Sequence, residues 1–400
     1  MTGPGTDGDG WQRARKLLSR VPLIDGHNDL PYALRDAGDM DLTKVDLAGP
    51  VSFTHTDLPR IATGGLGGQF WSVYVPASLA GEAAVATTLE QIDLVHRLAR
   101  RYPDRLELAV TAADVQRIFA AGRVASLIGA EGGHSIASSM GVLRSLYALG
   151  VRYLTLTHNN NVPWADSATD EPKAGGLTEF GRAVVGEMQR LGMLVDLSHV
   201  SPGTMRDALD VAAAPVMFSH SSARALCDHP RNVPDDVLAR LPGNGGLCMV
   251  AFVAQFVSAD CAAWDTRVTA DMRERGLDPR DIDARDQVGQ ERAVADPRPT
   301  ATLAQVADHV EHVREVAGIE HVGLGGDFDG TGWLPAGLAD VSGYPALFAE
   351  LLRRGWSEDD CARLAGGNLL RVLRDAEDAA QELARRHPPS TARIEELDGG

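Results

Sequence analysis

Eight short apolar runs, most of them followed by a segment with helical periodicity, constrain the fold of this 400-residue chain more than any other feature. Continuous apolar strands separated by amphipathic helices are typical of a parallel sheet covered by helices. We predict strands at residues 21–27, 70–76, 124–130, 151–157, 193–198, 215–219, 246–252 and 321–326. Eight such units in about 350 residues favour a closed (β/α)8 barrel of the TIM type, with a doubly wound open sheet as the alternative.

The remaining segments are interpreted as additions to one domain. We predict a disordered tail at residues 1–10, a single barrel domain at 11–385 and a polar C-terminal tail at 386–400. The charged stretch 258–300 is an insertion before the eighth strand, interpreted as a solvated helix pair, a lid or a subunit contact. A stripe at Leu303, Val306, Val310 and Val313 predicts the helix before that strand. Residues 357–385 are helical by pattern and would close the bottom or side of the barrel.

Composition argues against several classes of protein. A formal charge of −17, from 38 basic and 55 acidic residues, disfavours nucleic acid and anionic membranes as partners. The four cysteines include no CxxC pair, which argues against a zinc ribbon or a dithiol redox motif. We find no secretory signal, no run of about 18 apolar residues and no GPI signal, and we expect a cytoplasmic protein.

The first predicted strand ends in a pattern that suits metal binding. His27 and Asp29 follow the apolar run Val21-Pro-Leu-Ile24. Residues i and i+2 of a strand face the same side, so both side chains can point at one atom. An imidazole and a carboxylate that converge in this way form half of a divalent metal site, although the pair alone could simply share a hydrogen bond.

Other polar residues follow the later predicted strands. In a barrel of this type, chemistry gathers at the C-terminal strand ends. Five of the twelve histidines and several carboxylates fall at these ends, which is difficult to explain by packing alone. They are His27 and Asp29, Glu131 and His134, His158, His199, His220, and Asp327 and Asp329.

This arrangement predicts two metals. We expect His27 and Asp29 to hold the first, His199 and His220 the second, and Glu131 to bridge both. Nitrogen and oxygen ligands suit two Zn²⁺ ions, with Mn²⁺ or Co²⁺ as substitutes. None of the three lysines lies at a predicted strand end, so Glu131 is preferred over a carboxylated lysine as the bridge.

A series of motifs also resembles one family over nearly the whole chain. The motifs are Asp25-Gly-His-Asn-Asp-Leu-Pro31, Gly68-Gln-Phe-Trp-Ser-Val-Tyr74, Glu131-Gly-Gly-His134, Leu156-Thr-His-Asn159, Asp196-Leu-Ser-His199, Ser219-His-Ser-Ser222, His229-Pro-Arg-Asn-Val-Pro-Asp235, Gly325-Gly-Asp-Phe-Asp-Gly330 and Gly366-Gly-Asn-Leu-Leu-Arg371. In number and order they resemble the renal or membrane dipeptidase family of zinc peptidases, within the amidohydrolase superfamily.

The resemblance implies the same five metal ligands and adds roles for further residues. It implies that His158 contacts the substrate carbonyl, that Arg231 binds the terminal carboxylate of a dipeptide and that Asp327 shuttles the proton. Asp329 is the rival for that last role. The reaction expected is hydrolysis of a dipeptide, including L-Xaa-D-Xaa pairs, by a metal-bridging hydroxide. We expect Tyr74 to belong to the substrate pocket, and a homodimer is a further family-level expectation.

Three alternatives remain at this point. Another amidohydrolase-type barrel could act on a lactam, a cyclic amide or an ester. A barrel kept as a binding scaffold should have lost at least one ligand, and none is lost. A thiol hydrolase would need a cysteine at a strand end, whereas Cys227 lies past the predicted sixth strand.

Overall fold

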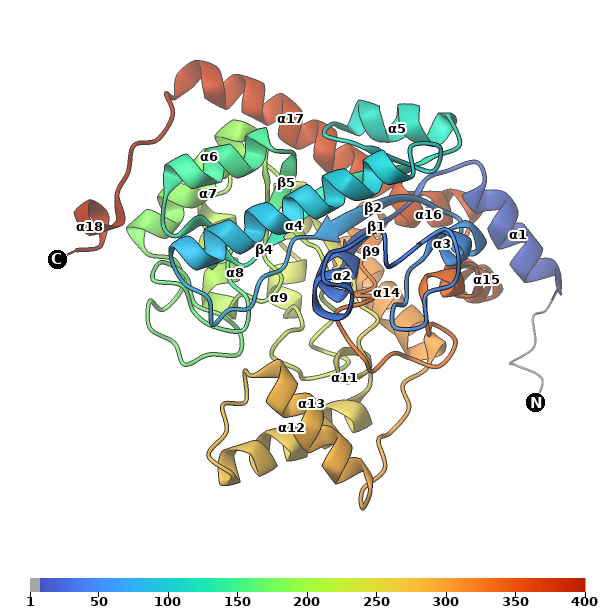
Figure 1. The fold of residues 1–400 in the computed structure, drawn as a ribbon. Helices are drawn as coiled ribbons and strands as arrows, with labels where there is room; N and C mark the ends of the chain where they lie inside the picture. Colours follow the sequence, from blue (N-terminus) through green and yellow to red (C-terminus); the bar gives the residue numbers. More distant parts are fainter. Residues whose placement is uncertain (1–7, 400) are drawn as a thin grey trace.

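The computed structural model describes residues 8–399 and contains a closed barrel of parallel strands surrounded by helices (Figure 1). The strands are β1 (Leu23–Asn28), β2 (Leu66–Ser72), β3 (Leu106–Leu108), β4 (Val124–Glu131), β5 (Val151–Thr155), β6 (Leu194–Asp196), β7 (Val216–Phe218), β8 (Leu247–Val250) and β9 (Val322–Leu324). Most strand residues are buried, as expected for a parallel sheet covered on both faces.

Eight of these strands form the ring. Starting from β1, each strand pairs with the next in the order β1, β2, β4, β5, β6, β7, β8 and β9. The pairing of Asp25 on β1 with Leu324 on β9 closes it. The predicted (β/α)8 barrel is therefore confirmed, and the open sheet is excluded.

Two details of the strand prediction were wrong. The second ring strand covers residues 66–72 rather than 70–76, because Gly67 and Gly68 interrupt the apolar pattern at its true start. The later residues Val73 and Val75 are buried outside the strand. The short strand β3 was missed; it lies beside the first half of β4, with Leu106 opposite Val124, and does not belong to the ring.

Helices follow most ring strands and cover the outside of the barrel. They are α1 (Gly8–Leu18), α2 (Leu30–Gly38), α3 (Leu58–Gly64), α4 (Glu82–Arg101), α5 (Ala112–Ala120), α6 (Met140–Ala148), α7 (Glu179–Leu191), α8 (Pro202–Val211), α9 (Asp235–Leu238), α10 (Leu241–Asn244), α11 (Ala254–Val257), α12 (Ala259–Glu274), α13 (Ile282–Ala293), α14 (Leu303–Ala317), α15 (Tyr344–Arg353), α16 (Glu358–Ala362), α17 (Asn368–Arg386) and α18 (Ile394–Leu397), with short 3₁₀ turns η1 (Gly133–Ile136), η2 (Ile319–His321) and η3 (Val341–Gly343) and a π turn η4 (Arg363–Gly367).

The predicted stripe of α14 faces the core. Thr302 and Gln305 form a capping box at its start, which satisfies amide groups that have no partner within the helix. Val306, Val310 and Val313 are fully buried.

The C-terminal helices close one end of the barrel. Leu369 and Leu370 of α17 belong to the same buried cluster as Ile24, Tyr153 and Met249 of the ring strands. Helix α17 runs across the top of the view in Figure 1. This apolar plug leaves the opposite end, where the strands finish, for polar side chains.

The insertion before the last strand is a pair of helices, α12 and α13, with a small apolar cluster of its own. Trp264, Val268 and Met272 of α12 pack there against Val288 of α13. The pair projects at the bottom of Figure 1, at the end of the molecule opposite α17.

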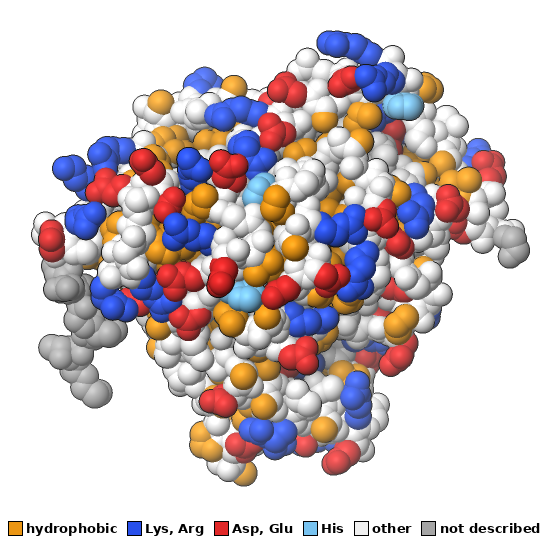
Figure 2. Space-filling model, turned by 180° about the vertical axis from the view of Figure 1, so that it is seen from behind, with side chains coloured by type: hydrophobic (Ala, Val, Ile, Leu, Met, Phe, Trp, Pro, Cys, Tyr) orange, Lys and Arg blue, Asp and Glu red, His pale blue; other side chains and the backbone are white. Residues whose placement is uncertain are grey.

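The two ends of the chain are described in part. Helix α1 begins at Gly8, so residues 8–10 of the predicted tail are helical, and residues 1–7 lie outside the described residues. Near the other end, Asp398 accepts a hydrogen bond of 2.6 Å from the Thr178 hydroxyl at the start of α7. Among the described residues, no helix is both long and apolar enough to cross a membrane. On the face in Figure 2, acidic and basic side chains are interspersed.

Candidate metal centre and active site

The predicted ligand residues meet at the open end of the barrel. His27 and Glu131 lie on β1 and β4, and the other predicted residues follow the ends of their strands. His27, Asp29, Glu131, His158, His199, His220 and Arg231 are all buried, with exposed fractions of 6% or less. This many buried polar groups require partners, because burial without them costs free energy.

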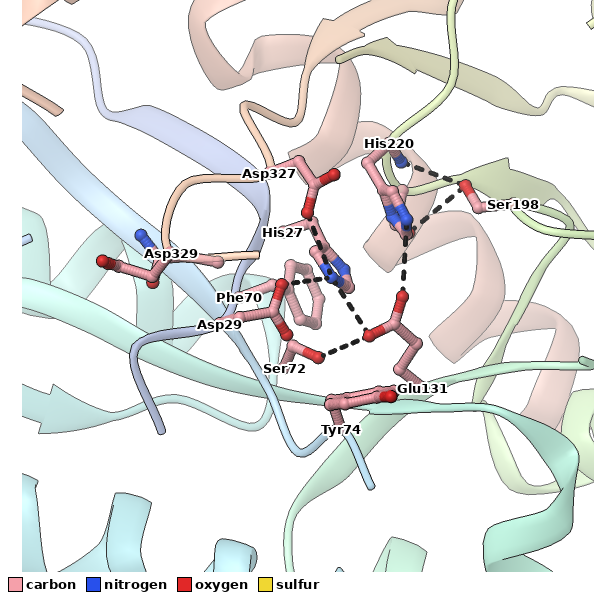
Figure 3. Close-up of polar contacts among 12 residues, drawn as sticks. His27, Asp29, Phe70, Ser72, Tyr74, Glu131, Ser198, His220, Asp327 and Asp329 are labelled. Atoms are coloured by element: carbon pink, nitrogen blue, oxygen red, sulfur yellow. Dashed lines mark hydrogen bonds and ion pairs between the residues drawn. The ribbon is translucent and has the colours of Figure 1, made fainter. Parts of the chain in front are cut away.

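Glu131 lies between His27 and His220, with one oxygen toward each (Figure 3). Its Oε2 atom is 3.4 Å from His27 Nε2, and the Ser72 hydroxyl donates to the same oxygen at 3.1 Å. Its Oε1 atom is 3.0 Å from His199 Nε2 and 3.4 Å from His220 Nε2. One carboxylate thus presents one oxygen to His27 and the other to His199 and His220.

Asp29 and Asp327 complete the side that contains His27. Asp29 Oδ2 lies 3.2 Å from His27 Nε2, and Asp327 Oδ1 lies 4.0 Å from the same nitrogen. Ligand atoms within 4.8 Å of one another define three overlapping groups: His27, Glu131 and His220; Glu131, His158 and His199; and His27, Asp29 and Asp327.

Contacts behind the ligands orient them, and the sequence analysis missed these. The Tyr153 hydroxyl is 2.8 Å from His27 Nδ1. Ser219 Oγ is 2.8 Å from His220 Nδ1 and donates to Asp196 Oδ2 at 2.6 Å. In both histidines Nδ1 is therefore engaged, and Nε2 faces the site. The only available signal was the position of Ser219 next to His220; nothing in the sequence pointed to Tyr153.

Asp25 connects two segments that carry candidate metal-binding residues. Its carboxylate accepts the His27 N–H and the Gly326 N–H, both at 2.7 Å, and also the Tyr344 hydroxyl. The end of β1 and the loop after β9 are therefore held by one buried side chain. The same loop is tight at Gly330, where a Cβ would collide with the carboxylates of Asp29 and Asp327.

Backbone strain is present at the strand ends of the site. His199, Asp327 and Asp329 have φ values of 67°, 59° and 67°. Left-handed backbone is uncommon for residues other than glycine and is often found at functional sites.

The electrostatics of the site favour a cation. Burial and neighbouring positive groups hold the pKa of His199 and His220 well below the ordinary value, so both are neutral, the form that binds metals. Burial disfavours the charged form of His27 too, but Tyr153, Glu131 and Asp29 outweigh it and raise its pKa. Burial raises the pKa of Asp327 well above its usual range, and Asp29 and Glu131 add to the effect.

Unpartnered buried atoms show that these residues fit a divalent metal. His27 Nε2 and Asp29 Oδ1 are buried without a hydrogen-bond partner among the described residues. The Nε2 atoms of His199 and His220 lie 2.9 Å apart, and both also face Glu131. Imidazole nitrogens and carboxylate oxygens without thiolates suit a borderline divalent cation such as Zn²⁺.

The remaining predicted residues surround this centre. The His158 ring lies 4.3 Å from the His199 ring and 4.8 Å from the Tyr74 ring, measured between centroids. Asp329 points away from His27 and accepts the His55 N–H at 2.5 Å (Figure 3). His134 also points away, with Nε2 3.1 Å from the Val75 carbonyl oxygen.

Arg231 is a buried cation without an ion pair. No carboxylate lies within 4.0 Å of its guanidinium among residues 8–399, and its nearest partners are the Ser221 hydroxyl at 3.4 Å and the His220 carbonyl at 3.3 Å. Burial lowers its pKa to about 10, against the opposing effect of Asp327 and Glu131. An anionic ligand group would complete this environment.

Comparison with known proteins identifies the family. The model of the membrane dipeptidase family, peptidase family M19, matches residues 11–387. The chain belongs to this family. Dipeptidase verJ of Clonostachys rogersoniana is 42% identical over 94% of this chain and 89% of its own length. Human dipeptidase 3 is also 42% identical, over 97% of this chain and 72% of its own length.

A solved structure of a metallopeptidase agrees with this placement. The Rhodobacter sphaeroides enzyme, crystallised with a phosphinate mimic of the dipeptide L-Ala-D-Ala, is 26% identical and has a TM-score of 0.74. The alignment covers 89% of this chain and 99% of that one. The chain is accordingly a dipeptidase of the M19 metallopeptidases, and the interpretation as a binding scaffold is set aside. Burial raises the pKa of Cys227 to about 11, which disfavours the nucleophilic thiolate that a thiol hydrolase needs.

Proposed function

We propose that this protein is a binuclear zinc dipeptidase that hydrolyses the single peptide bond of a dipeptide with a free C-terminal carboxylate. The observation that carries the proposal is the Glu131 carboxylate, whose Oε2 faces His27 while its Oε1 faces His199 and His220. Dipeptide hydrolysis follows from the family, and the two-metal site and the carboxylate requirement are inferred from the residues.

The five predicted ligands divide between two positions. His27 and Asp29 would hold one ion and His199 and His220 the other, with Glu131 shared. When bound, two such ions supply Lewis-acid activation of a water and of the scissile carbonyl.

Asp327 is assigned the proton transfer. Its carboxylate faces the His27 side of the centre, with Oδ1 4.0 Å from His27 Nε2, which places a proton acceptor beside the reacting groups. It would take the proton of the attacking water and deliver it to the leaving amine. Asp329 is bonded to the His55 backbone and faces away from the centre.

His158 is assigned to the substrate oxygen. Its Nε2 atom is 4.0 Å from Glu131 Oε1, the oxygen that also faces His199. A donor at this position would stabilise the charge that develops on the carbonyl oxygen, an effect typically worth about 10²–10³ in rate. Tyr74, whose ring packs against His158, would form part of the pocket wall.

Arg231 is assigned the terminal carboxylate. A planar guanidinium pairs with a carboxylate through two parallel hydrogen bonds. Its position near the ligand loop of His220 would select substrates that end one residue beyond the scissile bond. The L-Ala-D-Ala mimic in the Rhodobacter enzyme supports the inclusion of dipeptides with a D-residue at that end.

Metal analysis combined with a substrate panel tests the proposal. We expect about two zinc ions per chain, cleavage of L,L and L,D dipeptides, and no cleavage of a tripeptide or a C-terminally amidated dipeptide. Two metals with rapid cleavage of the amide would contradict the Arg231 assignment. Two metals without dipeptide cleavage would instead favour a lactam, cyclic amide or ester as substrate.

A further inference from the structure

The α12–α13 helix pair contacts the loops that surround the candidate active site. Asp265 of α12 approaches His229 in the loop after β7, and Arg280, between the two helices, pairs with Asp170 in the loop after β5. The helix pair is therefore connected to two different loops at the open end of the barrel.

His229 holds the backbone of Arg231. The Arg231 N–H donates to His229 Nδ1 at 3.2 Å. The two side chains also share one neighbour: the Phe256 ring lies 4.6 Å from the His229 ring and 5.2 Å from the Arg231 guanidinium carbon. Arg231 is thus connected to the His229 ring directly through its backbone N–H and indirectly, through Phe256, at its guanidinium.

Asp265 is placed to hold that ring from the other side. Its Oδ2 atom is 3.8 Å from His229 Nε2. Because Nδ1 accepts a hydrogen bond, Nε2 carries the proton and presents it toward the carboxylate. Arg285 of α13 donates two hydrogen bonds to the same carboxylate, from Nε to Oδ1 at 3.1 Å and from Nη2 to Oδ2 at 2.5 Å. Asp265 is 8% exposed, so this contact is sheltered from solvent.

We propose that Asp265 is a positioning residue through which the inserted helices set the place of Arg231, so that the insertion contributes to recognition of the substrate carboxylate. The chain of contacts runs from Arg285 to Asp265, then to His229 and to the Arg231 backbone. The inference rests on the proposed role of Arg231. Without Asp265 the ring can rotate or change tautomer, and Arg231 loses the acceptor that fixes its backbone.

The test compares Asp265→Asn with a matched variant of the same helix pair. For a dipeptide with a free carboxylate, we expect Asp265→Asn to raise KM about tenfold and to leave kcat within about twofold. Asp271→Asn removes a comparable contact between α12 and α13, the pair of Asp271 with Arg292, which does not reach His229. This control should change neither constant, and thermal unfolding of both variants measures any general loss of stability.

A double-mutant cycle with Arg231→Met separates positioning from other effects. Asp265→Asn should have no further effect on KM when Arg231 is already removed. An equal effect in both backgrounds, an unchanged KM in folded Asp265→Asn, or the same shift in Asp271→Asn would overturn the inference. If Asp265→Asn does not fold, Arg285→Gln removes the support of Asp265 and should raise KM in the same direction, and an unchanged KM there would also overturn it.

Failure of the inference can be distinguished from failure of the proposed function. If Arg231→Met itself leaves KM for the free dipeptide unchanged, the carboxylate role of Arg231 is wrong, and the inference falls with it. If Arg231→Met raises KM and Asp265→Asn does not, only the positioning role is wrong.

Discussion

The imidazole of His220 and the hydroxyl of Ser219 form a contact of 2.8 Å between Nδ1 and Oγ. The Ser219 hydroxyl donates its hydrogen bond to Asp196, so its oxygen accepts a hydrogen bond from Nδ1–H of the histidine. The two neighbouring residues thereby keep Nε2 of His220 unprotonated on the side of Glu131. Such contacts behind a ligand tune metal affinity.

Replacing Ser219 should therefore weaken metal binding. We expect Ser219→Ala to reduce the affinity for the second metal by about 10- to 100-fold, because the imidazole loses its fixed tautomer and orientation. Titration of the apoprotein with zinc against a competing chelator measures the change. Ser126→Ala is the control, since Ser126 Oγ is buried without a hydrogen-bond partner among residues 8–399. Equal affinities in both variants would show that the contact has no role in metal binding.

Glu131→Gln should lose metal as well as activity. An amide presents only one oxygen and carries no charge, so it cannot bridge two cations. Elemental analysis of the purified variant should find less than about two zinc ions per chain. Full metal content would show that Glu131 is not the bridge.

Asp327→Asn should separate chemistry from metal binding. We expect both metals to remain and turnover to fall by about 10²–10⁴, the range typical for loss of a positioned acid–base group. Asp329→Asn is the matched variant, because its carboxyl is also buried but bonds to His55. Retained activity in Asp327→Asn together with its loss in Asp329→Asn would reassign the proton transfer.

Arg231→Met should impair recognition of the dipeptide. We expect kcat/KM to fall by about 2–5 kcal/mol, as when one partner of a buried charge pair is removed. Steady-state kinetics with a free dipeptide measures the loss. Arg240→Met provides a control, because Arg240 pairs with Asp210 on the surface. A loss no larger than that of the control would show that the carboxylate is bound elsewhere.

His309 should make the protein less stable at acidic pH. Its Nδ1 accepts the Ala223 N–H at 3.0 Å, its Nε2 lies 3.3 Å from the Val257 carbonyl, and burial lowers its pKa from 6.5 to about 4. Above pH 6.5 the imidazole is neutral in both states. As the pH falls from 6.5 to 4, this imidazole becomes protonated in the unfolded chain but stays neutral in the folded protein. The free energy of unfolding therefore decreases by up to about 3 kcal/mol.

Urea unfolding across this range checks the prediction for His309. Between pH 6.5 and 4, the free energy of unfolding should decrease more steeply for the wild type than for His309→Gln. The difference in free energy of unfolding between the two proteins should therefore become smaller as the pH falls. Parallel curves would show that His309 is protonated equally in both states.

The fold and the residues that gather at the candidate metal centre were accessible from the sequence because both depend on local pattern. Eight apolar runs predicted the ring, although the second was displaced by four residues at Gly67 and Gly68. Once the strands were assigned, the rule that chemistry gathers at their C-terminal ends placed His27, Glu131, His199 and His220 on one rim. Parallel strands in a closed ring all finish at the same end, so residues at these positions lie on one rim.

Other features of the site required the tertiary structure. Asp327 and Asp329 are two residues apart and chemically identical, and only the left-handed turns after β9 direct one toward His27 and the other toward His55. Tyr153 bonds to His27 across 126 positions of the chain. No local pattern encodes such a pairing, because it depends on how the ring brings distant strands together.

The inserted helices illustrate the same division. Their charge and length predicted a helix pair before the last strand, which the structure contains. The contact between Asp265 on α12 and His229 in the loop after β7 joins residues 36 positions apart in sequence, and it arises from docking of the folded helix pair. By itself, the sequence determined the elements, their order and the chemical types at the strand ends, because periodicity and motif are local. Only the tertiary structure decided which side chains orient those groups, because burial and distance are properties of the closed barrel.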